Sequence, residues 1–232
     1  MRGACSSVSW NIEMVPVEFF FDLSSPWTRI AFHNIQALER EGLIALTWRP
    51  FLVGGVFNAV NDQVYAIRGE PDNPRYRHSG TWLREWADIA GVGMNFPSPH
   101  HPLKSVMAMR FCCALEHDRS TLFAFVARSF DAYFTDQLNL DDTDILIGIA
   151  DELGMPGSVL AERASSPEVK ARLRANTDEG IARGAFGSPT IFVDHDHVYF
   201  GNDQLPLVRR RAENSMKGAR FVTRGKAATA ER

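Results

Sequence analysis

Hydrophobic and polar positions in the first part of the chain follow two different periods. Val17–Asp22 is a short apolar run of strand length, and Leu43–Phe51 is a second run rich in β-forming residues. Between them, the apolar positions of Pro26–Glu41 recur at helical spacing, and Gly42 follows where a helix would end. A helix that joins two strands forms a βαβ unit, so these strands are predicted to be parallel.

The middle of the chain has a helical period without a strand pattern. Leu52–Asn61, with its two glycines, is predicted to be a loop that can carry ligand contacts, and Asp62–Pro74 is a polar segment broken by prolines. The helices predicted after it are Tyr76–Ala90, Leu103–Glu116, Arg119–Phe134, Asp142–Leu153, Pro156–Ala164 and Pro167–Arg183. The aromatic stripe from Leu122 to Phe134 is more typical of a core face than of a cofactor site.

The strand period returns near the end of the chain. Thr190–Val193 and Val198–Phe200 flank a polar turn, which predicts an antiparallel hairpin. A last helix is predicted at Gln204–Ala212, and either Asn202 or Asp203 can cap it.

Two serine–proline pairs stand at matching places in this pattern. Pro26 opens the first predicted helix, and Ser188-Pro189 precedes the strand Thr190–Val193. The order of elements is that of an α/β thioredoxin-like fold with a large inserted all-helical domain, in which the later proline is cis. The predicted division assigns residues 15–61 and 185–213 to the thioredoxin-like domain, 62–184 to the insertion, and 1–14 and 214–232 to N-terminal and mobile C-terminal tails.

The composition is ordinary for a globular protein, because 45% of the 232 residues are hydrophobic and 23% are charged. The formal net charge of -3, with no basic stripe before the tail, argues against nucleic-acid binding. No apolar run reaches about 18 residues, so no membrane span is expected. Residues 1–14 lack the apolar stretch of a signal peptide, which favours a cytoplasmic location, and Met14 is an alternative start.

The cysteines also favour a reducing compartment. Their number is odd, and Cys112 and Cys113 are adjacent, while Cys5 stands alone. The adjacent pair lies in an apolar helical run, so packing is its expected role. No His and Cys spacing is typical of a zinc site, His100-His101 belongs to a predicted loop, and no glycine-rich phosphate loop occurs. We therefore expect no metal.

The turn after the first strand is the first candidate for chemistry. Ser24 and Ser25 lie where a helix offers unpaired backbone N–H groups and the positive end of its dipole. Such a helix start stabilises an anion, for example a thiolate. The alternative is that one of the serines is only an N-cap.

The runs Phe21–Trp27, Trp48–Phe57, Phe186–Phe192 and Phe200–Asp203 occur in this order along the chain. Together they resemble the 2-hydroxychromene-2-carboxylate isomerase family, over about Val15–Ala212. Members of this family share their fold with kappa-class glutathione transferases and with bacterial disulfide oxidoreductases related to thioredoxin.

The resemblance implies that Ser25 is the catalytic residue and faces the sulfur of bound glutathione. Disulfide oxidoreductases carry Cys-x-x-Cys at this turn, whereas Ser25 and Thr28 take both positions here. Thiol–disulfide exchange needs a thiolate, so the turn argues against an oxidoreductase. A serine hydroxyl can instead donate a hydrogen bond to a thiolate and lower its pKa. A role as covalent nucleophile is disfavoured, because no histidine nearby is placed to take its proton.

The resemblance also implies a set of residues that bind glutathione. They are Ser25, Pro26, Trp27, Asn61, Ser188, Pro189, Asn202 and Asp203. In the family, the backbone at the position of Ser188 pairs with the cysteinyl part, as in strand addition. Asn202 and Asp203 match the positions that hold the γ-glutamyl end, whose ammonium group suits a carboxylate. Asn61, or Asp62 one residue later, matches a family asparagine.

The implied activity is a glutathione-dependent isomerisation of a small aromatic substrate by reversible thiol addition, carried out by a homodimer. A kappa-type glutathione transferase is an alternative, and a non-catalytic thioredoxin-fold binding protein is another. The chain departs from the family at Phe57–Val60, which lacks a lysine often found beside the asparagine, and at Gly80. A glycine inside a helix weakens that helix by about 1 kcal/mol. This departure leaves the non-catalytic binding protein as an alternative.

Overall fold

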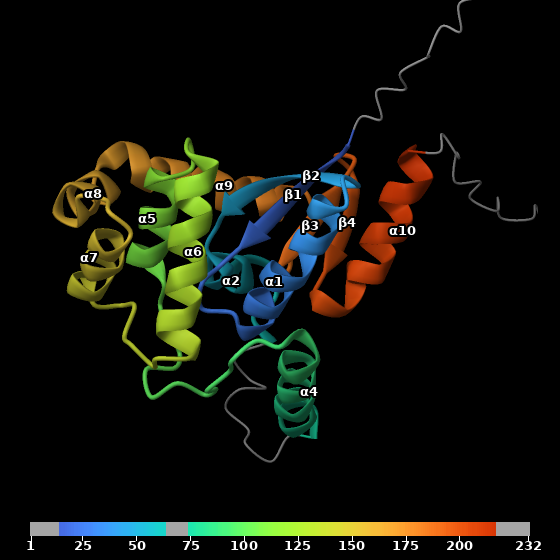
Figure 1. The fold of residues 1–232 in the computed structure, drawn as a ribbon, viewed down its shortest axis with the longest axis horizontal. Helices are drawn as coiled ribbons and strands as arrows, with labels where there is room; N and C mark the ends of the chain where they lie inside the picture. The colour runs from blue at the N-terminus through green and yellow to red at the C-terminus, as the bar shows by residue number, and fades with distance from the viewer. Residues whose placement is uncertain (1–13, 64–73, 217–232) are drawn as a thin grey trace, which may run out of the picture.

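A mixed four-stranded sheet lies at the centre of the computed structural model, which describes residues 14–63 and 74–216 (Figure 1). The strands are β1 (Val15–Phe21), β2 (Ile44–Pro50), β3 (Thr190–Val193) and β4 (His197–Phe200), in the order β2-β1-β3-β4. β1 runs parallel to β2 and antiparallel to β3, and β4 is antiparallel to β3. The predicted parallel pair and the predicted hairpin are both confirmed.

Helices make up most of the remaining described chain. They are α1 (Pro26–Arg40), α2 (Val53–Val60), α4 (Pro74–Ala90), α5 (Val106–Ala114), α6 (Arg119–Phe134), α7 (Thr143–Glu152), α8 (Gly157–Ala164), α9 (Pro167–Ala182), the 3-10 turn η1 (Asn202–Gln204) and α10 (Leu205–Met216). The bounds of α6 match the prediction, and those of α7, α8 and α9 lie within a residue of it, because their apolar positions keep a clear helical period.

The two faces of the sheet are covered by different helices. On one face, Val17 and Phe19 of β1 pack with Ile35 of α1 and Val208 of α10. On the other face, Phe20 packs in a smaller cluster that includes Val56 of α2, and Gly180 of α9 lies against its ring. Side chains of a strand alternate between faces, so both sides of β1 are buried.

One apolar core continues from the sheet into the helices α5–α8. The ring of Phe32 on α1 lies 4.8 Å from the ring of Trp48 on β2 and 5.1 Å from that of Phe123 on α6. The aromatic stripe of α6 is therefore core, as predicted. α9, in contrast, crosses the sheet, with Asn176 donating to the carbonyl of Pro50. The division into a thioredoxin-like domain and an inserted domain stays a prediction.

Helix α2 corrects the prediction of a loop at Leu52–Asn61. Gly54 and Gly55 lower the helix propensity of this segment, which is why its local pattern predicted a loop. Tertiary contacts outweigh that cost: Val53 and Val56 are buried, and the N–H of Val53 donates to the Asp22 carboxylate at 2.8 Å. Gly55 also permits a close approach, since a Cβ there would lie 3.1 Å from the Thr177 methyl carbon.

Two helix ends also differ from the prediction. α5 begins at Val106, three residues after the predicted Leu103, because Ser105 has a left-handed backbone with φ of 59°. The N–H groups of Lys104 and Ser105 are taken by the Asp141 carboxylate instead of by a helix. α10 continues to Met216, so the start of the predicted tail is helical. Residues 1–13, most of the predicted polar segment, and 217–232 lie outside the described chain.

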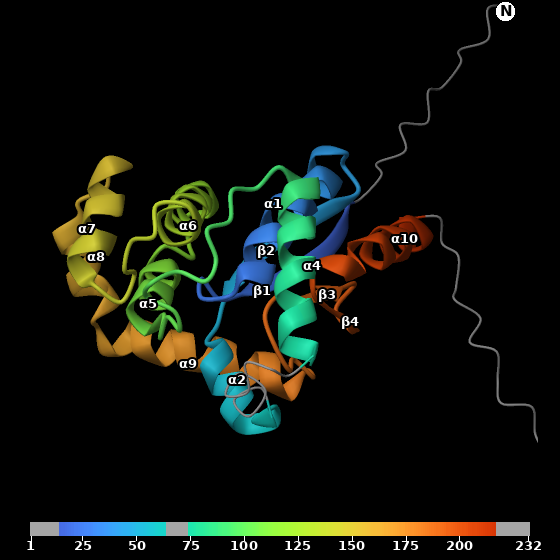
Figure 2. The same cartoon turned by 90° about the horizontal axis from the view of Figure 1, so that it is seen from below.

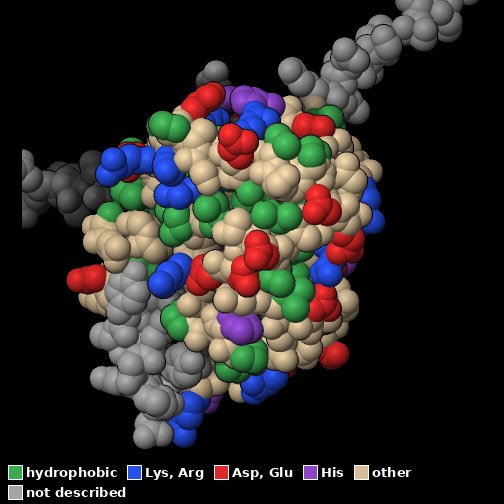
Figure 3. All heavy atoms as spheres, turned by 90° about the vertical axis from the view of Figure 1, so that its left-hand side faces the viewer, with side chains coloured by type: hydrophobic (Ala, Val, Ile, Leu, Met, Phe, Trp, Pro, Cys, Tyr) green, Lys and Arg blue, Asp and Glu red, His purple; other side chains and the backbone are tan. Residues whose placement is uncertain are grey.

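The surface at the end of the molecule formed by α7 and α8 carries acidic and basic side chains interspersed with apolar ones (Figure 3). No continuous basic stripe is seen on this face. Across residues 14–63 and 74–216, no helix is both long enough and apolar enough to span a bilayer.

Candidate functional site

Ser25 stands at the start of α1 and caps it. Its hydroxyl accepts the N–H of Thr28 at 3.2 Å, and Pro26 takes the first helical position. The predicted N-cap role is therefore confirmed, and it leaves the hydroxyl proton free for a second partner. That partner is the carbonyl of Ser188, at 3.0 Å from the Ser25 oxygen. Residues 163 positions apart in the chain thus meet at the helix start.

Ser188 precedes a cis peptide bond to Pro189, as the fold predicts. The loop Gly187–Pro189 leads into β3, which pairs with β1, and α1 follows β1 after a short turn. The sheet therefore places the loop beside the amino end of α1. Ser25, Pro26, Ser188 and Pro189, all predicted site residues, lie on these two adjoining segments.

Two residues that were not assigned a role from the sequence join the same network. The hydroxyl of Thr28 lies 2.7 Å from that of Ser188, and both side chains are buried. The backbone N–H of Asp22 donates to the Ser188 hydroxyl at 3.0 Å. The available signal for Asp22 was its position, as a polar residue directly after a buried strand. The signal for Thr28 was its place at the second cysteine position of the Cys-x-x-Cys turn of disulfide oxidoreductases.

Trp27 has a side chain and a backbone with different surroundings. Its indole packs beside Leu83 and Ala87 of α4, which runs next to α1 (Figure 2). Its backbone N–H makes no hydrogen bond to the described residues. Such unpaired donors are the groups with which a helix start binds an anion.

The remaining predicted site residues, Asn61, Asn202 and Asp203, lie on either side of the contact between Ser25 and Ser188. The side-chain amide of Asn61, at the end of α2, donates to the carbonyl of Phe186 at 3.0 Å. Asn202 is 2% exposed, and its side-chain oxygen accepts from Asn34 of α1 at 2.9 Å. Asp203 is exposed. Asn202, one of the two residues that could cap the last helix, therefore faces α1.

The electrostatics of the helix start favour an anion. The first turn of α1 itself holds no acidic residue, so no carboxylate within the helix competes for its dipole. The cysteines of α5 are not available as thiolates, because burial raises the pKa of Cys113 to about 12 and also raises the pKa of Cys112 well above its ordinary value. Their predicted role in packing is confirmed, since both are buried. Ser25 and Thr28 leave the turn itself without sulfur.

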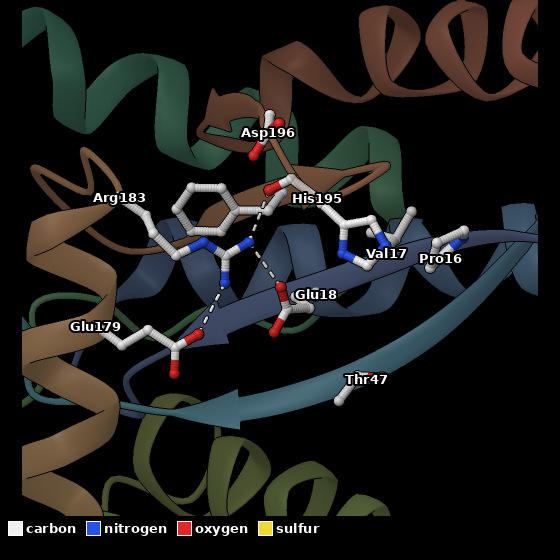
Figure 4. Close-up of a pocket in the computed structure, with 9 residues that line it drawn as sticks. Pro16, Val17, Glu18, Thr47, Glu179, Arg183, His195 and Asp196 are labelled. Carbon is white, nitrogen blue, oxygen red and sulfur yellow. Dashed lines mark hydrogen bonds and ion pairs between the residues drawn. The ribbon is translucent and has the colours of Figure 1, made fainter.

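A separate groove of about 540 Å³ opens near the amino end of β1 (Figure 4). Arg183 lies in it, bonded to Glu18 at 2.7 Å and Glu179 at 2.9 Å, and its guanidinium lies 3.9 Å from the ring of Phe192. The guanidinium of Arg183 and the two carboxylates in the groove are thus paired with one another. The groove is lined by the first residues of β1, whereas Ser25 follows the last, so the two are at opposite ends of the strand.

Metal ligation has no candidate in the part of the chain that the structure describes. No group of three or more His, Cys, Asp or Glu side chains there is placed to hold a metal ion. The groups that converge on the start of α1 are a hydroxyl, a free backbone N–H and backbone carbonyls. They can hold an anionic sulfur and pair with an extended peptide.

Known proteins resemble this chain over most of its length. A 2-hydroxychromene-2-carboxylate isomerase of Sphingobium xenophagum is 25% identical over 200 residues, covering 83% of this chain and 95% of the relative. Glutathione s-transferase kappa 2 of Caenorhabditis elegans is 28% identical over 220 residues, covering 87% and 93%.

A solved structure of a 2-hydroxychromene-2-carboxylate isomerase superposes with a TM-score of 0.72 at 20% identity, covering 88% of this chain and 97% of that one. This likeness confirms the predicted thioredoxin-like α/β fold. The family model of the DSBA-like thioredoxin domain matches residues 16–213. The chain therefore belongs to the DSBA-like thioredoxin domain family, and it is similar over most of its length to proteins named 2-hydroxychromene-2-carboxylate isomerase and glutathione transferase kappa.

Proposed function

We propose that this protein is a glutathione-dependent isomerase of the 2-hydroxychromene-2-carboxylate type. The observation that carries the proposal is the pairing of Ser25 at the start of α1 with the carbonyl of Ser188 before cis Pro189. This arrangement supports a site for a thiol, while Ser25 and Thr28 leave the turn itself without sulfur. A site of this kind needs a thiol from a ligand.

Ser25 and the start of α1 would hold the ligand's thiolate. A hydrogen bond from the Ser25 hydroxyl to an anion contributes about 1.5–3 kcal/mol. The free N–H of Trp27 and the helix dipole add to it, the dipole by about 0.3–1 kcal/mol. Each term favours the charged form, so the pKa of the bound thiol falls.

Docking of a tripeptide would exchange partners at Ser188. The Ser25 hydroxyl now gives its single proton to the Ser188 carbonyl. The N–H of a cysteinyl residue lying along the loop would take over that carbonyl by strand addition. Ser25 then turns its proton to the sulfur, so no hydrogen bond is lost.

The two ends of the tripeptide would reach α2 and η1. Asp203 is exposed, and its carboxylate suits the γ-glutamyl ammonium. Asn202 is buried against α1, so we propose that its side chain holds η1 in place and does not contact the ligand. Asn61 holds Phe186, two residues before Ser188, and lies at the other end of the loop.

The chemistry that glutathione supplies when bound is reversible addition of its thiolate to a conjugated carbon, rotation about the former double bond, and elimination. The chain's own part is to lower the thiol pKa at Ser25 and to orient the sulfur. The substrate class is a small aromatic acid with a conjugated double bond. We further propose that the protein is a cytoplasmic homodimer, and light scattering of the purified protein tests the dimer.

The test combines binding and turnover. We expect calorimetry to show one glutathione site per chain, and the ultraviolet change of the chromene acid to require glutathione. Ser25→Ala should lower turnover about 10–100-fold, the loss of one hydrogen bond to a charged group. Equal rates with and without glutathione would reject the proposal.

Two alternatives have distinct outcomes. The relative named glutathione transferase kappa favours conjugation as the second candidate. A transferase would release a stable conjugate and consume glutathione, whereas the isomerase returns it, and product analysis separates these results. A chain that binds no glutathione by calorimetry is a thioredoxin-fold protein with another role.

A further inference from the structure

Asp22 is a fully buried carboxylate that holds the starts of two helices. One oxygen accepts the N–H of Ser24 at 2.9 Å, in the turn that leads into α1. The other accepts the N–H of Val53 at 2.8 Å, at the first residue of α2. Leu52, the N-cap of α2, has no side chain that can do this, so Asp22 caps the helix from a distance of 31 residues.

The same residue also contacts the loop before β3. Its backbone N–H donates to the Ser188 hydroxyl, while the Ser188 carbonyl accepts from Ser25. Asp22 therefore touches all three segments that meet at the site: the start of α1, the start of α2 and the loop with cis Pro189.

These contacts close a ring. The first residue of α2, Val53, donates its N–H to the Asp22 carboxylate, and the C-cap of the helix, Asn61, donates from its side chain to the carbonyl of Phe186. Phe186 is two residues before Ser188, which returns to Asp22. A ring of this kind fixes the loop only while every link holds, and the Asp22 carboxylate is the link that ties α2 to the strand end.

We propose that Asp22 is a positioning residue of the thiol site, whose ionised carboxylate holds α2 and the Ser188 loop in the arrangement that binds glutathione. The inference rests on the proposed function. The ionised form is the one that accepts well on both oxygens at once. A proton on either oxygen weakens one link, and the loop loses part of its preorganisation.

The surroundings of Asp22 give this link a pH dependence. Burial raises the pKa of Asp22, and the hydrogen bonds from Ser24 and Val53 only partly oppose that rise. The side chains that face it from α5 are the hydroxyl of Ser105, directly before the helix, and the thiol of Cys112 within it, whose own pKa burial raises well above its ordinary value. Cys112 thus stays neutral, and acidification protonates Asp22 before ordinary exposed carboxylates.

Linkage fixes the sign. If glutathione binds the ionised form better, its affinity falls as the pH drops through the pKa of Asp22, and bound glutathione lowers that pKa. Asp22→Asn keeps the shape, but its NH₂ group faces an N–H donor, so one of the two links is lost at every pH.

The experiment is calorimetric titration of glutathione into wild type and Asp22→Asn between about pH 5 and pH 8. Near neutral pH we expect about tenfold weaker binding by the variant, the effect of one lost hydrogen bond to a charged group. The affinity of wild type should fall toward that of the variant on acidification, and the ratio of the two should approach one. In turnover, KM for glutathione should rise while kcat at saturation changes less than about twofold.

Two further variants keep the test decisive. Val53→Pro removes the N–H that Asp22 accepts, at a first helical position where proline is tolerated, and it should weaken glutathione binding in the same direction even if Asp22→Asn fails to fold. Glu18→Gln changes a carboxylate on β1 that is paired with Arg49 and Arg183, and it should leave the affinity for glutathione unchanged.

The outcomes separate the two ideas. If wild type binds no glutathione, the proposed function itself fails. If wild type binds it and Asp22→Asn shows the same affinity and the same pH dependence, the role of Asp22 is overturned and the proposed function stands. An equal loss in Glu18→Gln would also overturn it, because that loss would reflect general destabilisation.

Discussion

Replacing Ser25 by alanine tests the central interaction of the proposed site. The hydroxyl is the one side-chain donor at the start of α1 that the proposal directs at the sulfur. Losing a hydrogen bond of about 1.5–3 kcal/mol to a charged acceptor raises the pKa of the bound thiol by about 1–2 units. The N–H of Trp27 and the helix dipole remain, so the pKa should stay below that of free glutathione.

The same substitution has a separate effect on stability. Ser25 caps α1 through the N–H of Thr28 and also satisfies the Ser188 carbonyl. Removing both should cost about 1–2 kcal/mol in the free energy of unfolding. For a chain of this size, Tm should fall by about 2–8 °C. The variant should therefore remain folded at room temperature, and the thiol can be titrated in it.

The assay is the ultraviolet absorbance of the thiolate, followed against pH at saturating glutathione. Thr28→Val is the matched control, because it removes a hydroxyl from the same turn that contacts the Ser188 side chain. Its bound thiol should keep the pKa of wild type. A thiol pKa in Ser25→Ala equal to that of wild type would refute the reasoning, and so would an equal rise in Thr28→Val.

Three other predictions concern the surrounding structure. In Gly187→Ala, the new Cβ would lie 2.4 Å from a ring carbon of Phe200, so we expect a loss of about 1–3 kcal/mol in unfolding free energy, partly restored by adding Phe200→Leu and measured by denaturant titration. Unchanged stability in the single variant would contradict the close packing. Cys113, with its pKa raised to about 12 by burial, should resist a thiol reagent near pH 8 in the folded protein and react after unfolding, as mapped by mass spectrometry. Labelling at the rate of a free cysteine would show that it is accessible. Hydrogen bonds from Thr121 lower the pKa of Asp118 from 3.8 to about 2, so its contribution to stability is present above about pH 4 and is lost as the pH falls through 2. Tm curves of wild type and Asp118→Ala should converge on acidification, and parallel curves would count against this cap.

The prediction of the fold from the sequence succeeded where a local pattern was strong. The stop of β1 before Ser25-Pro26, the hairpin at β3 and β4, and the full extent of α6 follow from apolar spacing and from turn residues. The N-cap at Ser25 is likewise local, because a serine before proline at a strand end needs only its own helix to be satisfied.

The prediction failed at α2 because the stabilising contacts of that helix are distant in sequence. Gly54 and Gly55 make it a weak helix by itself, and its cap is Asp22, 31 residues away. The start of α5 is a second such case, since the Asp141 carboxylate holds the N–H groups before it.

The sequence by itself therefore determined the order and type of most elements, the burial of the adjacent cysteines and the lack of sulfur at the helix start. Only the tertiary structure decided that Ser25 and Ser188 meet, that Asp22 joins both, and that Asn202 faces α1. The physical reason is the sequence separation over which each kind of interaction acts. Periodicity and capping act within a few residues of chain, whereas these contacts depend on the register of β1 with β3 and on helices that pack across the sheet.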